Sequence, residues 1–320
     1  MSADESNQAS WVGPGILLVL VTALVSGVST FINAYAVQGT SSDAFVTVRN
    51  VAVAFMLIPI ALLAGRSFTQ PLRGVDWARL VTIGLIGGAI PFLLFFHGLQ
   101  IATAAHGAAT ATFGYRTLFL MATVFGVVAL GERLHGRVLV GAVLLLVGNV
   151  LLLSFTSPIW TDGTAFVLAA TLLWAAEYTL SRRTLRNLPS STVALGRMGF
   201  GAVFLVGYLA VAGELGGVGA LSVAQWGWVA ISAVLLCAFV GTFYAGLKRV
   251  DVGVATSALV LGFPITWALT LIAQGGAPTF NAALGATAIV AGVAVVIGWS
   301  SFRATWQYVQ RAVTGKAAAG

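Results

Sequence analysis

The sequence is short of charge. Only 8% of its 320 residues are Asp, Glu, Lys or Arg, against about 25% in an ordinary soluble domain, and 59% are hydrophobic. The mean hydropathy is +0.98, and this composition excludes a soluble globular protein. The net charge of +7 does not indicate nucleic-acid binding, because the 16 basic residues are separated by segments too apolar for a solvated basic face.

Several chemical signatures are also missing. The single cysteine, Cys237, lies in an apolar run, so the sequence predicts neither a disulfide framework nor a thiolate metal site. No cluster of ligand side chains suggests a metal ion. No Gly-Lys-Ser or Gly-Lys-Thr loop is present, which argues against direct coupling to ATP hydrolysis, and no cofactor is expected. The first ten residues lack the basic region of a cleaved signal peptide, so we expect the first apolar segment to be retained.

Ten apolar segments are long enough to cross a membrane. A helix needs about 20 apolar residues to span about 30 Å of hydrocarbon. Such runs cover residues 14–37, 44–65, 77–99, 103–130, 136–155, 164–181, 192–213, 223–247, 253–273 and 282–300. The loops between them are too short for a soluble catalytic domain. We therefore predict an all-α polytopic membrane protein with ten transmembrane helices.

The basic residues predict the orientation of the chain. They lie in or beside the even-numbered connections and after the last span, and the odd-numbered connections contain none. These residues are Arg66, Arg73, Arg79, Arg133, Arg137, Arg182, Arg183, Arg186, Lys248, Arg249, Arg303, Arg311 and Lys316. Because cytoplasmic loops carry the excess of Lys and Arg, both termini are predicted to be cytoplasmic. Residues 1–10 then form an N-terminal tail, and residues 302–320 form a basic C-terminal tail.

Comparison of the two halves indicates an internal repeat. Arg49 and Arg197 are offset by 148 residues, and so are the Phe-Phe-His-Gly-Leu of residues 95–99 and the Phe-Tyr-Ala-Gly-Leu of residues 243–247. Gly141 and Gly148 match Gly285 and Gly292 at an offset of 144. The alternative is chance similarity between apolar segments. An odd number of helices in each half, residues 11–155 and 156–301, makes the repeats inverted, which predicts a central cavity at their interface and alternating access.

Two short motifs add a family resemblance. Leu-Leu-Trp-Ala-Ala-Glu at residues 172–177 and Leu-Gly-Glu-Arg-Leu at 130–134, with the inverted repeat, resemble the EamA type of the drug/metabolite transporter superfamily. Within it the chain is most similar to bacterial inner-membrane exporters of aromatic and other neutral amino acids. The chain departs from the family where Leu120 stands in place of a proline opposite Pro264, and where the second Gly-Glu-Arg reads Gly-Gly-Ala at residues 275–277.

Charged groups inside spans cost about 2.5–3.5 kcal/mol each at the bilayer centre and mark candidate sites. Arg116 lies near the midplane, where it either binds a substrate carboxylate or is a structural residue that bonds helix carbonyls. Glu177 and Arg197 lie at similar depths and are predicted to pair, although Glu177 could instead bind a substrate ammonium or carry a proton. Arg49 has no acidic partner in the first helix and is interpreted as mainly structural, satisfied by Asn33, by Ser29 or by helix carbonyls.

Aromatic and flexible residues complete the predicted site. A buried Tyr hydroxyl or Trp N–H needs a partner that a cavity can supply, and His97 is taken as a hydrogen-bonded cavity residue. The residues predicted to contact substrate are Arg116, Tyr115, Trp174, Tyr178, Glu177, His97, Phe96, Tyr244 and Phe263. Pro91, Gly262 and Pro264 are predicted hinges.

The predicted function is transport rather than catalysis. The resemblance implies a carrier of the bacterial inner membrane that exports amino acids by alternating access. The partners would be that small molecule and the lipid bilayer, with no nucleic acid, and the oligomeric state stays open, a monomer being compatible. The alternatives are an exporter of drugs or other metabolites and, remotely, an intramembrane enzyme, although the predicted spans hold one Glu and no Asp.

Overall fold

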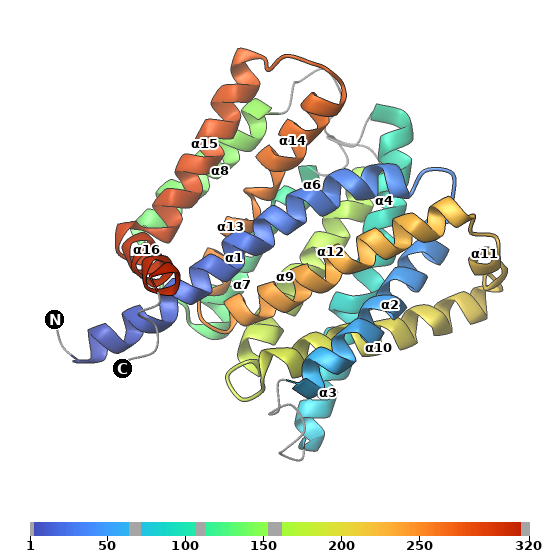
Figure 1. The fold of residues 1–320 in the computed structure, drawn as a ribbon, viewed down its shortest axis with the longest axis horizontal. Coiled ribbons are helices and arrows are strands. Elements are labelled where there is room, and N and C mark those ends of the chain that lie inside the picture. Colours follow the sequence, from blue (N-terminus) through green and yellow to red (C-terminus); the bar gives the residue numbers. More distant parts are fainter. Residues whose placement is uncertain (1–2, 64–71, 107–112, 153–161, 315–320) are drawn as a thin grey trace.

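A computed structural model describes the chain except for residues 1–2, 64–71, 107–112, 153–161 and 315–320, and it is helical throughout the described part (Figure 1). The first half contains α1 (Ala3–Ala36), α2 (Ser42–Leu63), α3 (Gly74–Ile83), the π-helical turn η1 (Gly84–Ala89), α4 (Ile90–His106), α6 (Phe113–Arg116), α7 (Leu118–Leu130) and α8 (Gly136–Leu152). The second half contains α9 (Asp162–Thr184), α10 (Ser190–Ala212), α11 (Gly216–Gly219), α12 (Val223–Leu247), α13 (Val252–Leu259), α14 (Gly262–Ala273), α15 (Phe280–Ile297) and α16 (Trp299–Val313).

Eight helical stretches of the described chain are long and apolar enough to cross a membrane. They are Val12–Ala36, Ser42–Leu63, Gly74–Ile101, Gly163–Thr184, Ser190–Ala212, Val223–Leu247, Val252–Ala273 and Phe280–Ile297. Gly114–Leu130 and Gly136–Leu152 are apolar but shorter, counted over the described residues alone. The count of ten spans therefore stays a prediction.

Both predicted tails are helical where they are described. α1 begins at Ala3, and α16 covers much of the C-terminal tail. Thr305 of α16 is buried against α1, and its hydroxyl donates to the Gly13 carbonyl at 3.3 Å. Trp299, Phe302 and Trp306 of this helix stay more than half exposed. A segment predicted as a tail from its charge is thus an amphipathic helix beside the start of α1.

Glycines on repeat-related helices bring α8 and α15 together. A Cβ on Gly141 would lie 2.9 Å from the Gly292 carbonyl oxygen, and one on Gly148 would lie 2.8 Å from the Gly285 oxygen. The later glycine of α8 therefore contacts the earlier glycine of α15, so the two helices run antiparallel. They lie side by side in Figure 1. Each glycine thus packs on the sequence equivalent of the other, and this antiparallel arrangement is as expected of inverted repeats.

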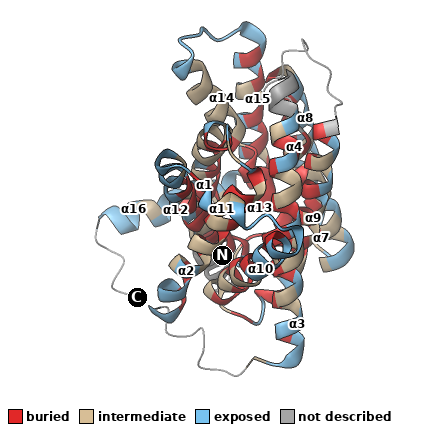
Figure 2. Ribbon diagram, turned by 90° about the vertical axis from the view of Figure 1, so that its right-hand side faces the viewer, coloured by how far each residue is buried: buried red, intermediate tan, exposed pale blue. Residues whose placement is uncertain are grey.

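A second pair of crossings follows the same relation. A Cβ on Gly98 of α4 would lie 2.6 Å from the Gly163 oxygen of α9, and one on Gly246 of α12 would lie 3.2 Å from the Gly15 oxygen of α1. Gly15 and Gly163 are offset by 148 residues, and so are Gly98 and Gly246, so the first and third helices of each repeat are in register. The crossings gather buried residues in the middle of the bundle, coloured red in Figure 2.

The two ends of the bundle differ in charge. At the end we call the basic end, hydrogen bonds link the connection 248–251 to α9 and to the connection 185–189, and Glu132 of the connection 131–135 accepts from the Val252 N–H at 3.0 Å. Arg182 Nη1 donates to the Lys248 carbonyl at 2.6 Å, and Lys248 Nζ donates to the Leu188 carbonyl at 2.9 Å. At the opposite end, the connections 37–41 and 213–222 meet, and Tyr208 donates to Asp43 at 3.1 Å.

Two spans are interrupted near their middles. The fourth breaks at Thr117, whose hydroxyl donates to the Gly114 carbonyl at 2.7 Å, so the span bends without the family's proline. The ninth breaks between Leu259 and Gly262, next to Pro264. Pro91 is the second residue of α4, which follows η1 directly. The predicted hinges thus lie at or beside irregular turns, and their motion remains a proposal.

Candidate functional site

A cavity of about 630 Å³ lies between the two repeats. Its walls are formed by Ser26, Ser29, Thr30, Asn33, Arg49, Phe92, Phe95, Phe96, Leu99, Tyr115, Trp174, Tyr178, Arg197, Leu236 and Phe239. A neighbouring cavity of about 470 Å³ contains Arg116, Phe263 and Thr256, and shares Ser26, Thr30 and Tyr115 with the first. The larger cavity extends toward the opposite end, to Asn33, which lies one turn before the end of α1.

Aromatic rings form one wall of the larger cavity. Phe95 stands at its centre, with its ring centroid 5.6 Å from those of Phe96 and Tyr115 and 5.4 Å from that of Trp174. Phe92 meets Trp174 edge to face at 5.4 Å. Such a wall offers apolar faces and ring edges to an apolar or aromatic ligand. Four of the predicted aromatic contacts, Tyr115, Trp174, Tyr178 and Phe96, line this one chamber.

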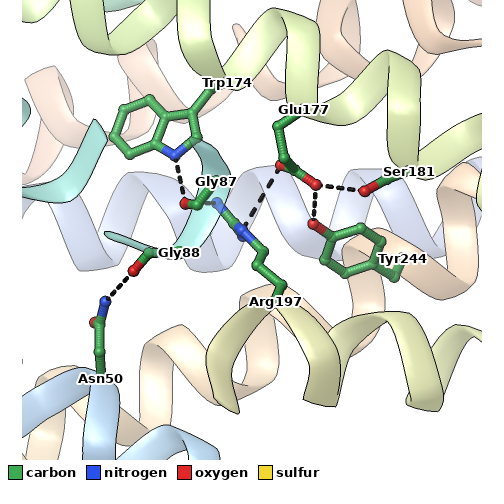
Figure 3. Close-up of polar contacts among 8 residues, drawn as sticks. All are labelled: Asn50, Gly87, Gly88, Trp174, Glu177, Ser181, Arg197 and Tyr244. Atoms are coloured by element: carbon green, nitrogen blue, oxygen red, sulfur yellow. Dashed lines mark hydrogen bonds and ion pairs between the residues drawn. The ribbon is translucent and has the colours of Figure 1, made fainter. Parts of the chain in front are cut away.

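A backbone carbonyl anchors several of these side chains (Figure 3). In an α-helix the Gly87 carbonyl would accept from the N–H of residue 91, and Pro91 has none. The oxygen instead accepts from Trp174 Nε1 at 3.1 Å and from Arg197 Nη2 at 3.0 Å. Asn50 Nδ2 donates to the next carbonyl, Gly88, at 3.1 Å. Pro91 therefore has a second consequence besides softening the helix, since it leaves an acceptor for the residues around the cavity.

Below the cavity, toward the basic end, lies a buried polar cluster. Glu177 Oε2 is 3.7 Å from Arg197 Nε, an ion pair rather than a hydrogen bond. Oε1 of the same carboxylate accepts from the hydroxyls of Ser181 and Tyr244 (Figure 3). All four residues are at most 1% exposed. Glu177 and Tyr244, expected to contact substrate, are not among the residues that line the cavity and are buried on its basic-end side.

Arg49 has partners other than those expected. Its Nε and Nη2 donate to the side-chain oxygen of Asn50 at 3.2 and 3.0 Å, and its guanidinium carbon lies 4.8 and 4.7 Å from the ring centroids of Phe92 and Phe96. Asn33, proposed from the sequence as a partner, donates to Ser29 at 3.2 Å and accepts from Ser232 at 2.6 Å. Arg49 is 2% exposed yet lines the cavity.

Arg116 and His97 lie apart from this chamber. The Arg116 guanidinium carbon is 2.9 Å from the centre of the Phe263 ring, in the smaller cavity. His97 is exposed, and its ring meets Phe166 at 5.0 Å. It follows Phe96 by one residue, which turns it about 100° around α4 and out of the cavity. The expectation of a cavity histidine is therefore corrected.

The site also contains residues that sequence reasoning missed. Asn50 orients Arg49, and Ser232 fixes Asn33 from α12. Asn50 and Ser232 are polar residues within apolar spans, and this could have marked them in the sequence as residues that need a buried partner. The Gly87 carbonyl carried none, because a backbone acceptor is visible only once the helix geometry is known.

Comparison with known proteins places the chain in a family. The model of the EamA-like transporter family matches residues 13–154 and 162–298, one match in each repeat. No curated protein matches the chain. A solved structure described as "Crystal structure of protein" is 23% identical, with a TM-score of 0.69 over 88% of this chain and 96% of that one, and supports the fold. Since the family model covers most of both halves, the chain belongs to the EamA-like transporter family.

Proposed function

We propose that this transporter exports neutral amino acids, aromatic ones among them, through the larger cavity. The supporting observation is the combination of an aromatic wall with buried Arg49 and Arg197 in one chamber of about 630 Å³. A neutral amino acid can place an apolar side chain against the wall and its carboxylate near the Arg49 guanidinium, whereas a purely apolar drug offers Arg49 no anion.

The transport cycle would be alternating access between the inverted repeats. The Glu177 cluster closes the cavity toward the basic end, and the interruptions at Thr117 and near Gly262 supply bends at which helices can move. With the two shorter apolar helices included, the chain would cross the membrane ten times. In this proposal the membrane is a bacterial inner membrane, and the basic end and both termini lie on its cytoplasmic side, an orientation that the positive-inside rule supports.

Counterflow in proteoliposomes tests the substrate. We expect labelled phenylalanine and other neutral amino acids to exchange, and nucleosides and organic cations not to. Trp174→Leu should slow exchange at least tenfold, because the indole forms the cavity wall and bonds to Gly87. Trp226→Leu is the matched control, since Trp226 is 45% exposed on α12. Failure of every amino acid to exchange would overturn the substrate, and equal slowing by both substitutions would remove Trp174 from the site.

A further inference from the structure

The polar cluster that closes the cavity has a counterpart in the other repeat. The packing of Gly15 on Gly246 and of Gly163 on Gly98 sets the register of the first and third helices at an offset of 148. With the same offset, Arg197 corresponds to Arg49, Glu177 to Ser29, Ser181 to Asn33 and Tyr244 to Phe96. The second set comes from α1, α2 and α4, whereas the first comes from α9, α10 and α12.

The two clusters share their contacts as well as their register. Ser181 donates to Glu177, and Asn33 donates to Ser29. The Arg197 guanidinium carbon lies 5.9 Å from the ring centroid of Tyr244; for Arg49 and Phe96 the distance is 4.7 Å. The arginines lie seven residues after the starts of α10 and α2, about 10 Å from opposite ends of the bundle.

One group is different between them, the carboxylate. Where Glu177 stands beside Arg197, the corresponding Ser29 offers only a hydroxyl to the surroundings of Arg49. The bonds described for Arg49 go to the neutral amide of Asn50, and the described residues that line the cavity include no Asp or Glu. A buried cation without a nearby anion is costly in a membrane interior.

The second difference is access. Ser29, Asn33, Arg49 and Phe96 all line the larger cavity, whereas among the closing cluster only Arg197 does. The space beside Arg49, where the other repeat has the Glu177 carboxylate beside Arg197, is therefore open to the cavity.

We propose that the carboxylate of the transported molecule binds between Arg49, Ser29 and Asn33, in the place that Glu177 holds in the other repeat. The substrate is then a small monocarboxylate whose remaining part lies against Phe92, Phe95 and Trp174. This rests on the proposed function and deepens it, since it assigns the carboxylate to Arg49 rather than to Arg116, whose guanidinium lies against Phe263 in the smaller cavity.

Three ligands separate the carboxylate from the ammonium: phenylalanine, 3-phenylpropanoate and phenethylamine. Binding to purified protein is measured by ligand-induced shifts in melting temperature and by radioligand displacement. We expect wild type to bind both carboxylates. Arg49→Gln should weaken the two carboxylates by about 10- to 100-fold and leave phenethylamine almost unaffected. Loss of carboxylate binding in Arg116→Gln, but not in Arg49→Gln, would overturn the assignment.

Ser29→Glu supplies the missing carboxylate from the protein itself. It should melt above Ser29→Gln, the uncharged side chain of equal size, because Glu can pair with Arg49 as Glu177 pairs with Arg197. It should also bind phenylalanine at least about tenfold more weakly than Ser29→Gln does, since the place is already filled. Equal affinities and equal melting temperatures of the two variants would contradict the proposal.

Failure of the proposed function would look different. If wild type exchanges amino acids while the Ser29 and Arg49 variants show no selective loss of carboxylates, the carboxylate site is wrong and the function stands. If wild type exchanges no amino acid but 3-phenylpropanoate stabilises it and not Ser29→Glu, the carboxylate site stands and the amino-acid substrate is wrong. If neither carboxylate affects wild type, the carboxylate site is overturned.

Discussion

The three arginines inside the bundle are held in three different ways. Arg197 has a carboxylate partner in Glu177 and a backbone acceptor in Gly87. Arg49 has an amide and two aromatic rings, and Arg116 has the Phe263 ring. An ion pair leaves little attraction for a ligand, whereas a cation beside rings and an amide can still accept an anion. The three residues are of one type, so the proposed substrate contact depends on the partners of each arginine and could not be chosen from the residue type alone.

The Glu177 and Arg197 pair makes a prediction about stability. Glu177→Gln should destabilise the protein by about 3–5 kcal/mol, because it leaves the Arg197 charge buried without its counter-ion. Arg197→Gln should cost a similar amount. The double variant should cost clearly less than the sum of the two, since neither charge is then left alone. Reversible unfolding in detergent and SDS measures the three values. Additive losses would show that the two side chains do not interact.

Much of this cluster could be anticipated from the sequence, and the orientation of the α4 residues could not. Glu177 and Arg197 are rare charges at matching depths on consecutive helices, so a pairing was a natural expectation. Residues 90–101 are apolar except for His97 and Gln100, and two polar side chains are too few to show which residues point inward. The sequence predicted both Phe96 and His97 as substrate contacts, and only the packing of α4 on α9 separates them.

At the scale of the elements, close helix crossings locate the site. η1 approaches α10 so closely that a Cβ on Gly88 would lie 2.2 Å from the Arg197 carbonyl oxygen. This approach brings the Gly87 carbonyl within reach of Arg197 and Trp174. Glycine at residue 88 is required by the neighbouring backbone of α10, which cannot move aside as a flexible side chain would.

Two glycines of α10 provide a matched test of this crossing. A Cβ on Gly201 would lie 2.7 Å from three backbone atoms of Gly88, while one on Gly199 would meet nothing within 4 Å. Gly201→Ala should therefore destabilise the protein by about 1–3 kcal/mol and reduce exchange, since it pushes η1 away. Gly199→Ala should be neutral or stabilise by up to about 1 kcal/mol, because alanine favours helix. Thermal melting in detergent compares them, and equal effects would argue against the close crossing.

The Glu132 carboxylate joins the two repeats at the basic end. It follows the left-handed Gly131 that ends α7, and it accepts from the Val252 N–H at 3.0 Å, the first residue of α13. It thereby satisfies one of the free N–H groups at a helix start. Glu132→Ala should cost about 1 kcal/mol through loss of this cap, whereas Glu132→Gln retains an acceptor oxygen and should cost less.

The same carboxylate predicts a dependence on pH. Burial, which outweighs the Val252 hydrogen bond, raises the pKa of Glu132 above its ordinary value of 4.5. Between 4.5 and the raised pKa, the folded state binds more protons than the unfolded state, so wild type loses stability as pH rises through this window. Glu132→Gln lacks this loss. The melting temperature of wild type relative to Glu132→Gln should therefore fall as pH rises, and an increase would show that the pKa is lowered instead.

The whole molecule was the most predictable scale, because its main signals are composition and repetition. Charges and glycines set several span ends correctly, such as the start of α8 at Gly136 and both ends of α12. The π-turn at Gly84–Ala89, the break at Thr117 and helix α16 were not predicted. Each depends on how one helix packs against another, and the pattern of apolar residues along a single segment contains no information about that packing.

Alternating access between inverted repeats makes a prediction about two equivalent positions. Asn33 and Ser181 are offset by 148 residues; Asn33 lines the larger cavity, whereas Ser181 is buried beyond it, toward the basic end. In a Cys237→Ala background, Asn33→Cys should react with a membrane-impermeant maleimide from the side of the opposite end, and Ser181→Cys should not react. Conditions that open the basic end should reverse this pattern. Ser181→Cys should then react from the basic end, and Asn33→Cys should become protected. The reason is that one rearrangement exchanges the environments of the two repeats. Mass spectrometry of protein in sealed vesicles measures both rates. Simultaneous labelling of both positions from one side would indicate a channel-like opening and contradict an exchange between the repeats.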